Sequence, residues 1–181
     1  MVNLAPGAEK ARWLSYFSDL TPAAIKGDRV LAAIDVGTNS IHMVVVKVQP
    51  DLPAFTIVDR EKETVRLGNF NETTKELTSA AMDRAVAALK RCYAIAASFQ
   101  AEAILAVATS AVREASNGAA FLDRIQQEVG LVVNLISGPE EARRIYLGVL
   151  SGVEFRGQPH AIIDIGGGST ELILEIGRAH V

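Results

Sequence analysis

The sequence predicts an α/β fold, and two kinds of apolar pattern are the main evidence for it. Short β-rich runs bounded by Gly, Asn and Pro are typical of strands, whereas apolar residues at spacings of three and four are typical of helices. The two patterns alternate along the chain, with strands first, then helix, strand, helix, strand and helix, and strands again. This order favours a sheet flanked by helices.

The N-terminal part is expected to hold a leader and then a β-hairpin. Residues 1–29 carry two prolines and a weakly apolar patch, so we expect a leader with one short helix. The apolar run Val30–Ile34 and the β-rich run Ile41–Val48 are joined by a Gly/Asn turn, which predicts a β-hairpin. After a proline break, Phe55–Val58 and Thr64–Leu67 are predicted as two further extended segments.

The middle of the chain predicts two helices around one strand. From Thr78, apolar residues recur at helical spacing and predict a helix with one face on the sheet. The continuous apolar run Ala103–Ala108 predicts a strand that is buried on both faces. A second helix is predicted through Phe121–Val129, and Gly130 is expected to end it.

The C-terminal part predicts a strand, a helix and a second hairpin. Val132–Ile136 is predicted as a strand, and Gly138–Leu150 as a helix with a proline in its first turn. Ala161–Asp164 and Leu172–Leu174 are apolar runs on either side of a Gly-rich turn, so they predict a second hairpin.

Composition excludes several classes of function. A formal net charge of −3 offers no basic field for a nucleic acid, so any bound anion must be held by local geometry. Cys92 is the single cysteine, which excludes an intrachain disulfide and favours a reducing compartment; we expect it to be a small buried residue. No apolar segment is long enough to span a bilayer, and no secretory signal is recognisable. A cytoplasmic protein without a membrane partner is therefore expected.

The two predicted hairpins are an internal repeat. Ile34–Ser40 aligns with Ile163–Ser169 without a gap, and Ile, Asp, Gly and Ser match in place at an offset of 129 residues. That offset is about the size of a domain. We therefore expect one complete lobe over residues 30–158 and the first hairpin of a truncated second lobe over residues 159–174.

The repeated turn has the chemistry of a phosphate site. Glycines let successive N–H groups turn towards an anion, and an aspartate can hold the divalent cation that a phosphate brings. The alternative is a pair of tight turns with Asx hydrogen bonds, but such turns need no shared aspartate. The metal ligands would be Asp35 and Asp164, and the predicted phosphate-binding residues are Gly37, Thr38, Asn39, Ser40, Gly166, Gly167, Gly168, Ser169 and Thr170.

Polar residues also follow two predicted strands at their carboxyl ends, where ligands bind in open α/β sheets. After the first strand, Thr109 and Ser110 fit a cap for the next turn, and Arg113 either reaches the phosphate with two hydrogen bonds or stays outside the site. After the second, Ser137 and Glu140 fit the S-x-x-E capping box.

Several other side chains keep two interpretations. Glu141 lies ~100° around the helix from Glu140, where its carboxylate could activate a water molecule or only complement the helix dipole. Glu171 could be a ligand of metal or water, or an ordinary strand-edge carboxylate. His42 lies in an apolar strand, so we interpret it as structural, and Arg143–Arg144 as a solvated helix face.

Four motifs follow one another along the chain, namely Asp35–Ser40, Ala108–Arg113, Ser137–Arg143 and Asp164–Glu171. In this order they resemble the motifs of the exopolyphosphatase/guanosine pentaphosphate phosphohydrolase (Ppx/GppA phosphatase) family. The resemblance covers Val30–Leu174. It implies a ribonuclease-H-like lobe of the actin/Hsp70/sugar-kinase (ASKHA) superfamily, with a mixed sheet flanked by helices and with two lobes closing over a phosphate site.

The resemblance also implies roles for individual residues. Glu141 matches the family's catalytic base, and Arg113 an arginine that faces the cleaved phosphate. Asp164 and Glu171 match acids linked to the divalent metal and the attacking water, and Asp35 matches the acid of the first loop. With Mg²⁺ or another divalent cation, the implied reaction is hydrolysis of the terminal phosphoanhydride of polyphosphate or guanosine pentaphosphate, releasing orthophosphate.

Some alternatives stay open at this point. A kinase of the same superfamily and a non-catalytic sensor of polyphosphate or guanosine phosphates are the rival functions, and a homodimer of the full-length protein is a further possibility. Since half of the predicted clamp is absent, little activity is expected of the 181 residues alone. Glu175–Val181 resembles the translation of a sequencing adapter, so we expect Ile176–Val181, and provisionally Glu175, not to be native.

Overall fold

The computed structural model describes residues 28–49, 54–71, 73–155 and 158–175. Most of the predicted leader and tail therefore lies outside the described residues. The elements are β1 (Arg29–Val36), β2 (Ser40–Gln49), β3 (Ala54–Thr64), α2 (Ser79–Ser98), β4 (Ala103–Ala108), α3 (Ser110–Glu114), α4 (Gly118–Val129), β5 (Val133–Leu135), α5 (Gly138–Gly152), β6 (His160–Ile165) and β7 (Thr170–Glu175).

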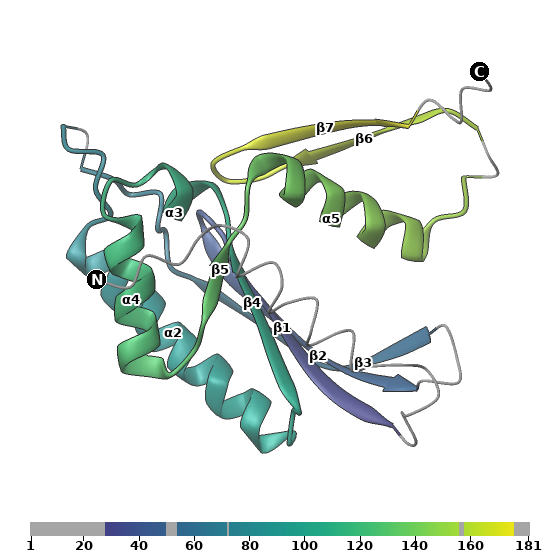
Figure 1. Cartoon of the computed structure of the whole chain (residues 1–181), viewed down its shortest axis with the longest axis horizontal. Helices are drawn as coiled ribbons and strands as arrows, with labels where there is room; N and C mark the ends of the chain where they lie inside the picture. Colours follow the sequence, from purple (N-terminus) through teal and green to yellow (C-terminus); the bar gives the residue numbers. More distant parts are fainter. Residues whose placement is uncertain (1–27, 50–53, 72, 156–157, 176–181) are drawn as a thin grey trace, which may run out of the picture.

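A five-stranded sheet in the order β3-β2-β1-β4-β5 forms the centre of the molecule. The pairs β1–β2 and β2–β3 are antiparallel, whereas β1–β4 and β4–β5 are parallel. Helices α2 and α4 lie on one side of this sheet, and α5 lies on the other side together with the β6–β7 hairpin (Figure 1). The predicted α/β class with a mixed sheet is confirmed. No helix of the described residues is long and apolar enough to cross a membrane.

The first hairpin and the extended piece Phe55–Val58 are confirmed, but the prediction of a separate extended piece over Thr64–Leu67 is wrong. One strand, β3, contains Phe55–Val58 and ends at Thr64. Beyond it, the N–H groups of Val65 and Arg66 both donate to the carbonyl of Asn39, at 3.0 and 2.9 Å. Val65 and Leu67 alternate because they are buried in the core, not because they pair in a sheet.

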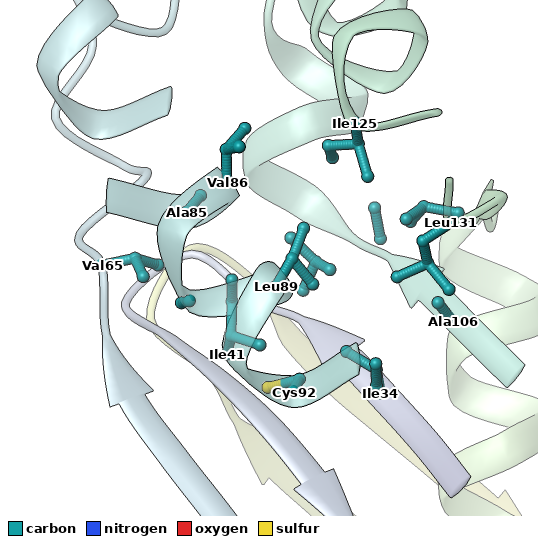
Figure 2. Packing of buried hydrophobic residues seen from close by; sticks show 14 of the residues in the cluster. Ile34, Ile41, Val65, Ala85, Val86, Leu89, Cys92, Ala106, Ile125 and Leu131 are labelled. Carbon is teal, nitrogen blue, oxygen red and sulfur yellow. The ribbon is translucent and has the colours of Figure 1, made fainter. Parts of the chain in front are cut away.

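The core lies between the sheet and α2 (Figure 2). Ile34 and Ile41 from the first hairpin lie beneath Leu89 and Cys92 of α2, and all four side chains are buried. Helix α2 begins as predicted, because the Thr78 hydroxyl caps it by accepting from the Ala81 N–H at 3.3 Å. The burial of Cys92 is confirmed.

Two details of the predicted packing are wrong. Tyr93, expected on the buried face of α2, is 43% exposed, and Cys92 takes the buried position beside Leu89 instead. Strand β4 is buried on one face only, through Ala106 and Ala108, while its other residues are half-buried. The reason is that no described helix packs closely on the second face of the sheet, since α5 has no buried residue.

The short helix α3 was not predicted, because a single turn carries no apolar period. It joins β4 to α4, and Gly118 at the start of α4 lies so close to the carbonyl of Val112 that any Cβ would clash there. Helix α4 ends as predicted at Gly130, whose φ of 74° lies in the left-handed region that glycine adopts without strain.

Helix α5 confirms half of the predicted capping box. The Ser137 hydroxyl accepts from the Glu140 N–H at 3.4 Å, as predicted. The Glu140 carboxylate, however, accepts from the Arg143 and Arg144 guanidinium groups at 2.7 to 2.9 Å. These charge-assisted bonds are stronger than a bond to a neutral N–H, and they lower the pKa of Glu140 to about 2. Arg143 and Arg144 thus form ion pairs on an exposed helix face.

The second hairpin repeats the first, but no helix of the described residues covers its apolar face as α2 covers that of the first. Strands β6 and β7 pair antiparallel, and four of their apolar residues are between 62% and 78% exposed. Shifted by the 129-residue offset, the same positions in the first hairpin are at most 2% exposed, beneath α2. The exposed residues are Ile163, Ile165, Leu172 and Leu174, and their counterparts are Ile34, Val36, Met43 and Val45.

Candidate active site

The two repeated loops have the same local backbone geometry. In the first, the Gly37 N–H donates to the carbonyl of Ser40 at 3.1 Å. In the second, the Gly166 N–H donates to the carbonyl of Ser169 at 3.0 Å. The repeat seen in the sequence is therefore a repeat in structure, and it leaves Thr38, Asn39 and their counterparts at the tips of the turns.

The tips of the two loops are in contact. A Cβ added to Gly167 would clash with the Asn39 side chain. One added to Gly168 would clash with Thr38 Oγ1 and lie only 2.8 Å from Ser110 Oγ. Glycine is required at both positions by this close approach, and the structure brings the predicted loop residues of the two hairpins face to face.

Three carboxylates from three elements gather beside the loops. Asp35, at the end of β1, has a pKa raised to about 6, first by burial and then by the negative charges of Glu141 and Asp164. Asp35 is nevertheless exposed as a residue, so it is crowded by protein on some sides and open to solvent on another. Glu171 on β7 is paired directly with Asp164 on β6, and directly paired residues share a face of the hairpin.

Arg113 holds Glu141. Its Nη1 atom lies 3.0 Å from Glu141 Oε2 and also donates to the carbonyl of Ile136 at 3.0 Å. Helices α3 and α5 are thereby linked, and the Glu141 side chain is only 14% exposed. Glu141 thus faces inward, towards Asp35, while the predicted contact between Arg113 and phosphate stays a prediction.

The acids fit a cation only in combination with other ligands. Within the described ranges, no group of three or more His, Cys, Asp or Glu side chains is arranged to hold a metal ion. The pKa of Asp35 is raised, however, by burial and also by the negative charges of Glu141 and Asp164. A divalent cation would offset these negative charges, and phosphate oxygens and water commonly complete the ligand set of Mg²⁺. Asp35 and Asp164 therefore fit the predicted role.

Two further polar residues lie beside the candidate site. Ser110 is buried, donates to Glu114 Oε1 at 2.8 Å and lies against Gly168, and the cap predicted for Thr109 is absent. His42 is exposed and lies directly across from Asp35 in the β1–β2 pairing, and its structural interpretation stays a prediction. In the repeat, His42 occupies the position that Glu171 has in the second hairpin.

Residues 44–180 match the model of the Ppx/GppA phosphatase family. This chain belongs to that family. A curated relative, the guanosine-5'-triphosphate,3'-diphosphate pyrophosphatase of Pseudoalteromonas atlantica, is 34% identical over 147 residues. That alignment covers 81% of this chain and 29% of the relative.

Solved structures of Ppx/GppA proteins show the same fold. The Aquifex aeolicus family member is 30% identical, with a TM-score of 0.72 over 83% of this chain and 48% of the other. An exopolyphosphatase from Cytophaga hutchinsonii is 35% identical, with a TM-score of 0.77 over 82% of this chain and 47% of the other. The chain spans about half the length of these solved relatives, and it matches one lobe of them.

Proposed function

We propose that this chain is the first lobe, with the opening hairpin of the second, of a phosphohydrolase that removes the terminal phosphate from polyphosphate or guanosine pentaphosphate. The observation that carries the proposal is the contact between two matched glycine loops, with Gly168 against Thr38 and Ser110. Asp35 lies beside that contact, and its pKa is raised by burial and by the charges of Glu141 and Asp164.

The loops would bind the phosphate that is removed. Successive backbone N–H groups in a Gly-rich turn form a nest for an anion, and the Thr38 and Ser169 hydroxyls add donors. Donors that are already in place stabilise negative charge on a transferred phosphoryl group without reorganising. Two loops that face each other would hold such a group from both sides.

Glu141 would act as the general base. Its carboxylate accepts the proton of a water molecule while the water oxygen forms a bond to the terminal phosphorus. The bridging P–O bond breaks, and its electrons leave with the shortened phosphate chain. Arg113 keeps Glu141 in position through the 3.0 Å contact, and Glu171 is the second candidate for holding the attacking water.

Asp35 and Asp164 would hold the divalent cation. When bound, Mg²⁺ supplies positive charge that neutralises phosphate oxygens. The protein's own part is to keep two carboxylates from the two halves of the repeat at one place, although burial and nearby negative charges raise the pKa of Asp35.

Both substrates remain within the proposal, because they share a terminal phosphoanhydride. The curated relative is named for a guanosine nucleotide and the Cytophaga hutchinsonii relative for polyphosphate.

We place the protein in the cytoplasm, since its single cysteine, Cys92, is buried as a free thiol. Nucleic acid and membrane partners are not part of the proposal.

The test uses a longer chain that contains both lobes. With Mg²⁺ and polyphosphate or guanosine pentaphosphate, Glu141→Gln should lower orthophosphate release by about 10²- to 10⁴-fold, because the base is lost. Glu140→Gln is the matched control, since the Glu140 carboxylate binds Arg143 and Arg144 on the exposed face of the same helix turn.

An unchanged rate in Glu141→Gln would sink the assignment of the base. Binding of both substrates without any turnover would favour a sensor. Phosphate transfer that requires an added acceptor would favour a kinase.

A further inference from the structure

A hollow lined by arginines lies behind the first glycine loop, where β3 leads into α2. Thr64, Arg66, Asn69 and Arg84 line a space of about 410 Å³. The loop that carries Arg66 is bound to the first glycine loop through three backbone bonds. Two of these join Val65 and Arg66 to the carbonyl of Asn39, and the Gly68 N–H donates to the carbonyl of Thr38 at 3.0 Å. None of the four lining residues has a role in the proposed reaction.

The charges of this hollow are not neutralised by the part of the chain that the structure describes. Six arginines there pair with carboxylates, namely Arg29, Arg91, Arg113, Arg124, Arg143 and Arg144. Arg60, Arg66 and Arg84 have no such ion pair among the described residues, and two of these three line the same hollow. Arginines that converge without a carboxylate favour an anionic ligand.

The backbone holds both arginines in place. Arg84 Nε donates to the carbonyl of Val65 at 3.0 Å, which orients the guanidinium on α2. Arg66 has a φ of 50°, in the left-handed region that a residue with a side chain rarely adopts. Such strained conformations cluster at ligand sites, where the surrounding structure keeps them. Here the hydrogen bond from the Arg66 N–H to the glycine loop keeps it.

We propose that this hollow is a second phosphate-binding site, which holds an inner phosphate of a chain whose terminal phosphate lies between the two glycine loops. The proposal rests on the proposed function for the identity of that chain. Two guanidinium groups can each bind phosphate with paired hydrogen bonds, and the Asn69 amide and Thr64 hydroxyl are further donors. Inorganic polyphosphate and guanosine pentaphosphate share this chemistry, and the experiment separates them.

The experiment is calorimetric titration of the 181-residue chain with long-chain polyphosphate, guanosine pentaphosphate or pyrophosphate, each with Mg²⁺. Arg66→Gln should weaken binding of the long ligand about tenfold, whereas pyrophosphate, which has no inner phosphate, should bind as before. Arg66→Lys should recover only part of the loss, because it restores the charge without the paired donors. Arg60→Gln is the control, since it removes the same charge from exposed β3.

The outcomes separate cleanly. A loss for polyphosphate alone, or for guanosine pentaphosphate alone, supports the site and identifies its ligand. Three results would overturn the proposed second site. The first is that Arg66→Gln loses no affinity for either long ligand, the second is an equal loss for pyrophosphate, and the third is the same loss in Arg60→Gln. Within the described residues, the Arg66 side chain makes no hydrogen bond or ion pair, so Arg66→Gln should fold normally, and an unchanged melting temperature checks this. Turnover is not measured, so failure of the proposed reaction would be seen separately.

Discussion

The chemistry of the Asp35 carboxyl group is changed by the fold. In isolation its carboxyl would titrate near 3.8, but burial and the charges of Glu141 and Asp164 raise its pKa to about 6. Near neutral pH, folding therefore brings negative charges together at one place. This electrostatic cost is what a bound cation would remove.

The raised pKa of Asp35 predicts how stability depends on pH in a chelator. Because the folded pKa lies above the unfolded one, the contribution of Asp35 to stability is fully present below about pH 4 and is lost as the pH rises through about 6. Asp35→Asn removes this loss. As the pH rises from about 4 to about 6, the free energy of unfolding of the variant should therefore increase by about 1 kcal/mol relative to that of the natural chain, after allowance for solvent screening. Unfolding measured across this pH range checks it, and a constant difference would count against the cluster.

Residues of the candidate site could be singled out from the sequence where the repeat marked them. Asp35, Asp164 and the loop glycines share one motif, so a comparison of two segments was enough to find them. The ion pair between Arg113 and Glu141 could not be predicted from the sequence, because it joins two helices whose relative position depends on packing. Ser110 was missed for the same reason, since its neighbour Gly168 lies on the other hairpin.

The glycine loops act as a pair of elements, and this predicts the effect of one added methyl group. Gly168→Ala should weaken binding of pyrophosphate with Mg²⁺ about tenfold, a loss of about 1.4 kcal/mol, because its Cβ would displace Thr38 and Ser110. Gly148→Ala is the control, since a Cβ in that part of α5 would meet nothing within 4 Å. Equal binding by the two variants in titration would show that the loops do not act together.

Helix α2 supplies a prediction about the core. Leu89 is fully buried against the sheet, whereas Tyr93, four residues on, is 43% exposed. Leu89→Ala should lower the free energy of unfolding by about 2–5 kcal/mol through lost burial and a cavity. Tyr93→Ala should cost clearly less. Denaturant unfolding of both variants measures the difference, and equal losses would contradict this packing.

Elements were predictable where their patterns were long or carried a specific end signal. Both hairpins, helix α2 and the end of α4 at Gly130 were found, because several turns of periodicity or a left-handed cap marked them. The extent of β3 and the presence of α3 could not be predicted from the sequence. Val65 and Leu67 alternate like a strand while they leave the sheet, and the five residues of α3 are too few to show a period.

In the whole molecule, the proposed phosphate site would be shared between two copies of the same hairpin. The first copy is covered by α2, whereas the matching apolar face of the second is exposed in the described structure. The chain spans about half the length of its solved relatives. The repeat offset of 129 residues predicts a site between one lobe and the first hairpin of the next.

Titration of the chain with pyrophosphate and Mg²⁺ shows whether both copies contribute to one site. Asp35→Asn and Asp164→Asn should each remove most of the Mg²⁺-dependent binding, because the two carboxylates would hold the same cation. Asp123→Asn, on the exposed surface of α4, should bind like the natural chain. Unchanged binding in Asp164→Asn, with Asp35→Asn impaired, would mean that the second hairpin lies beside the phosphate site without forming part of it.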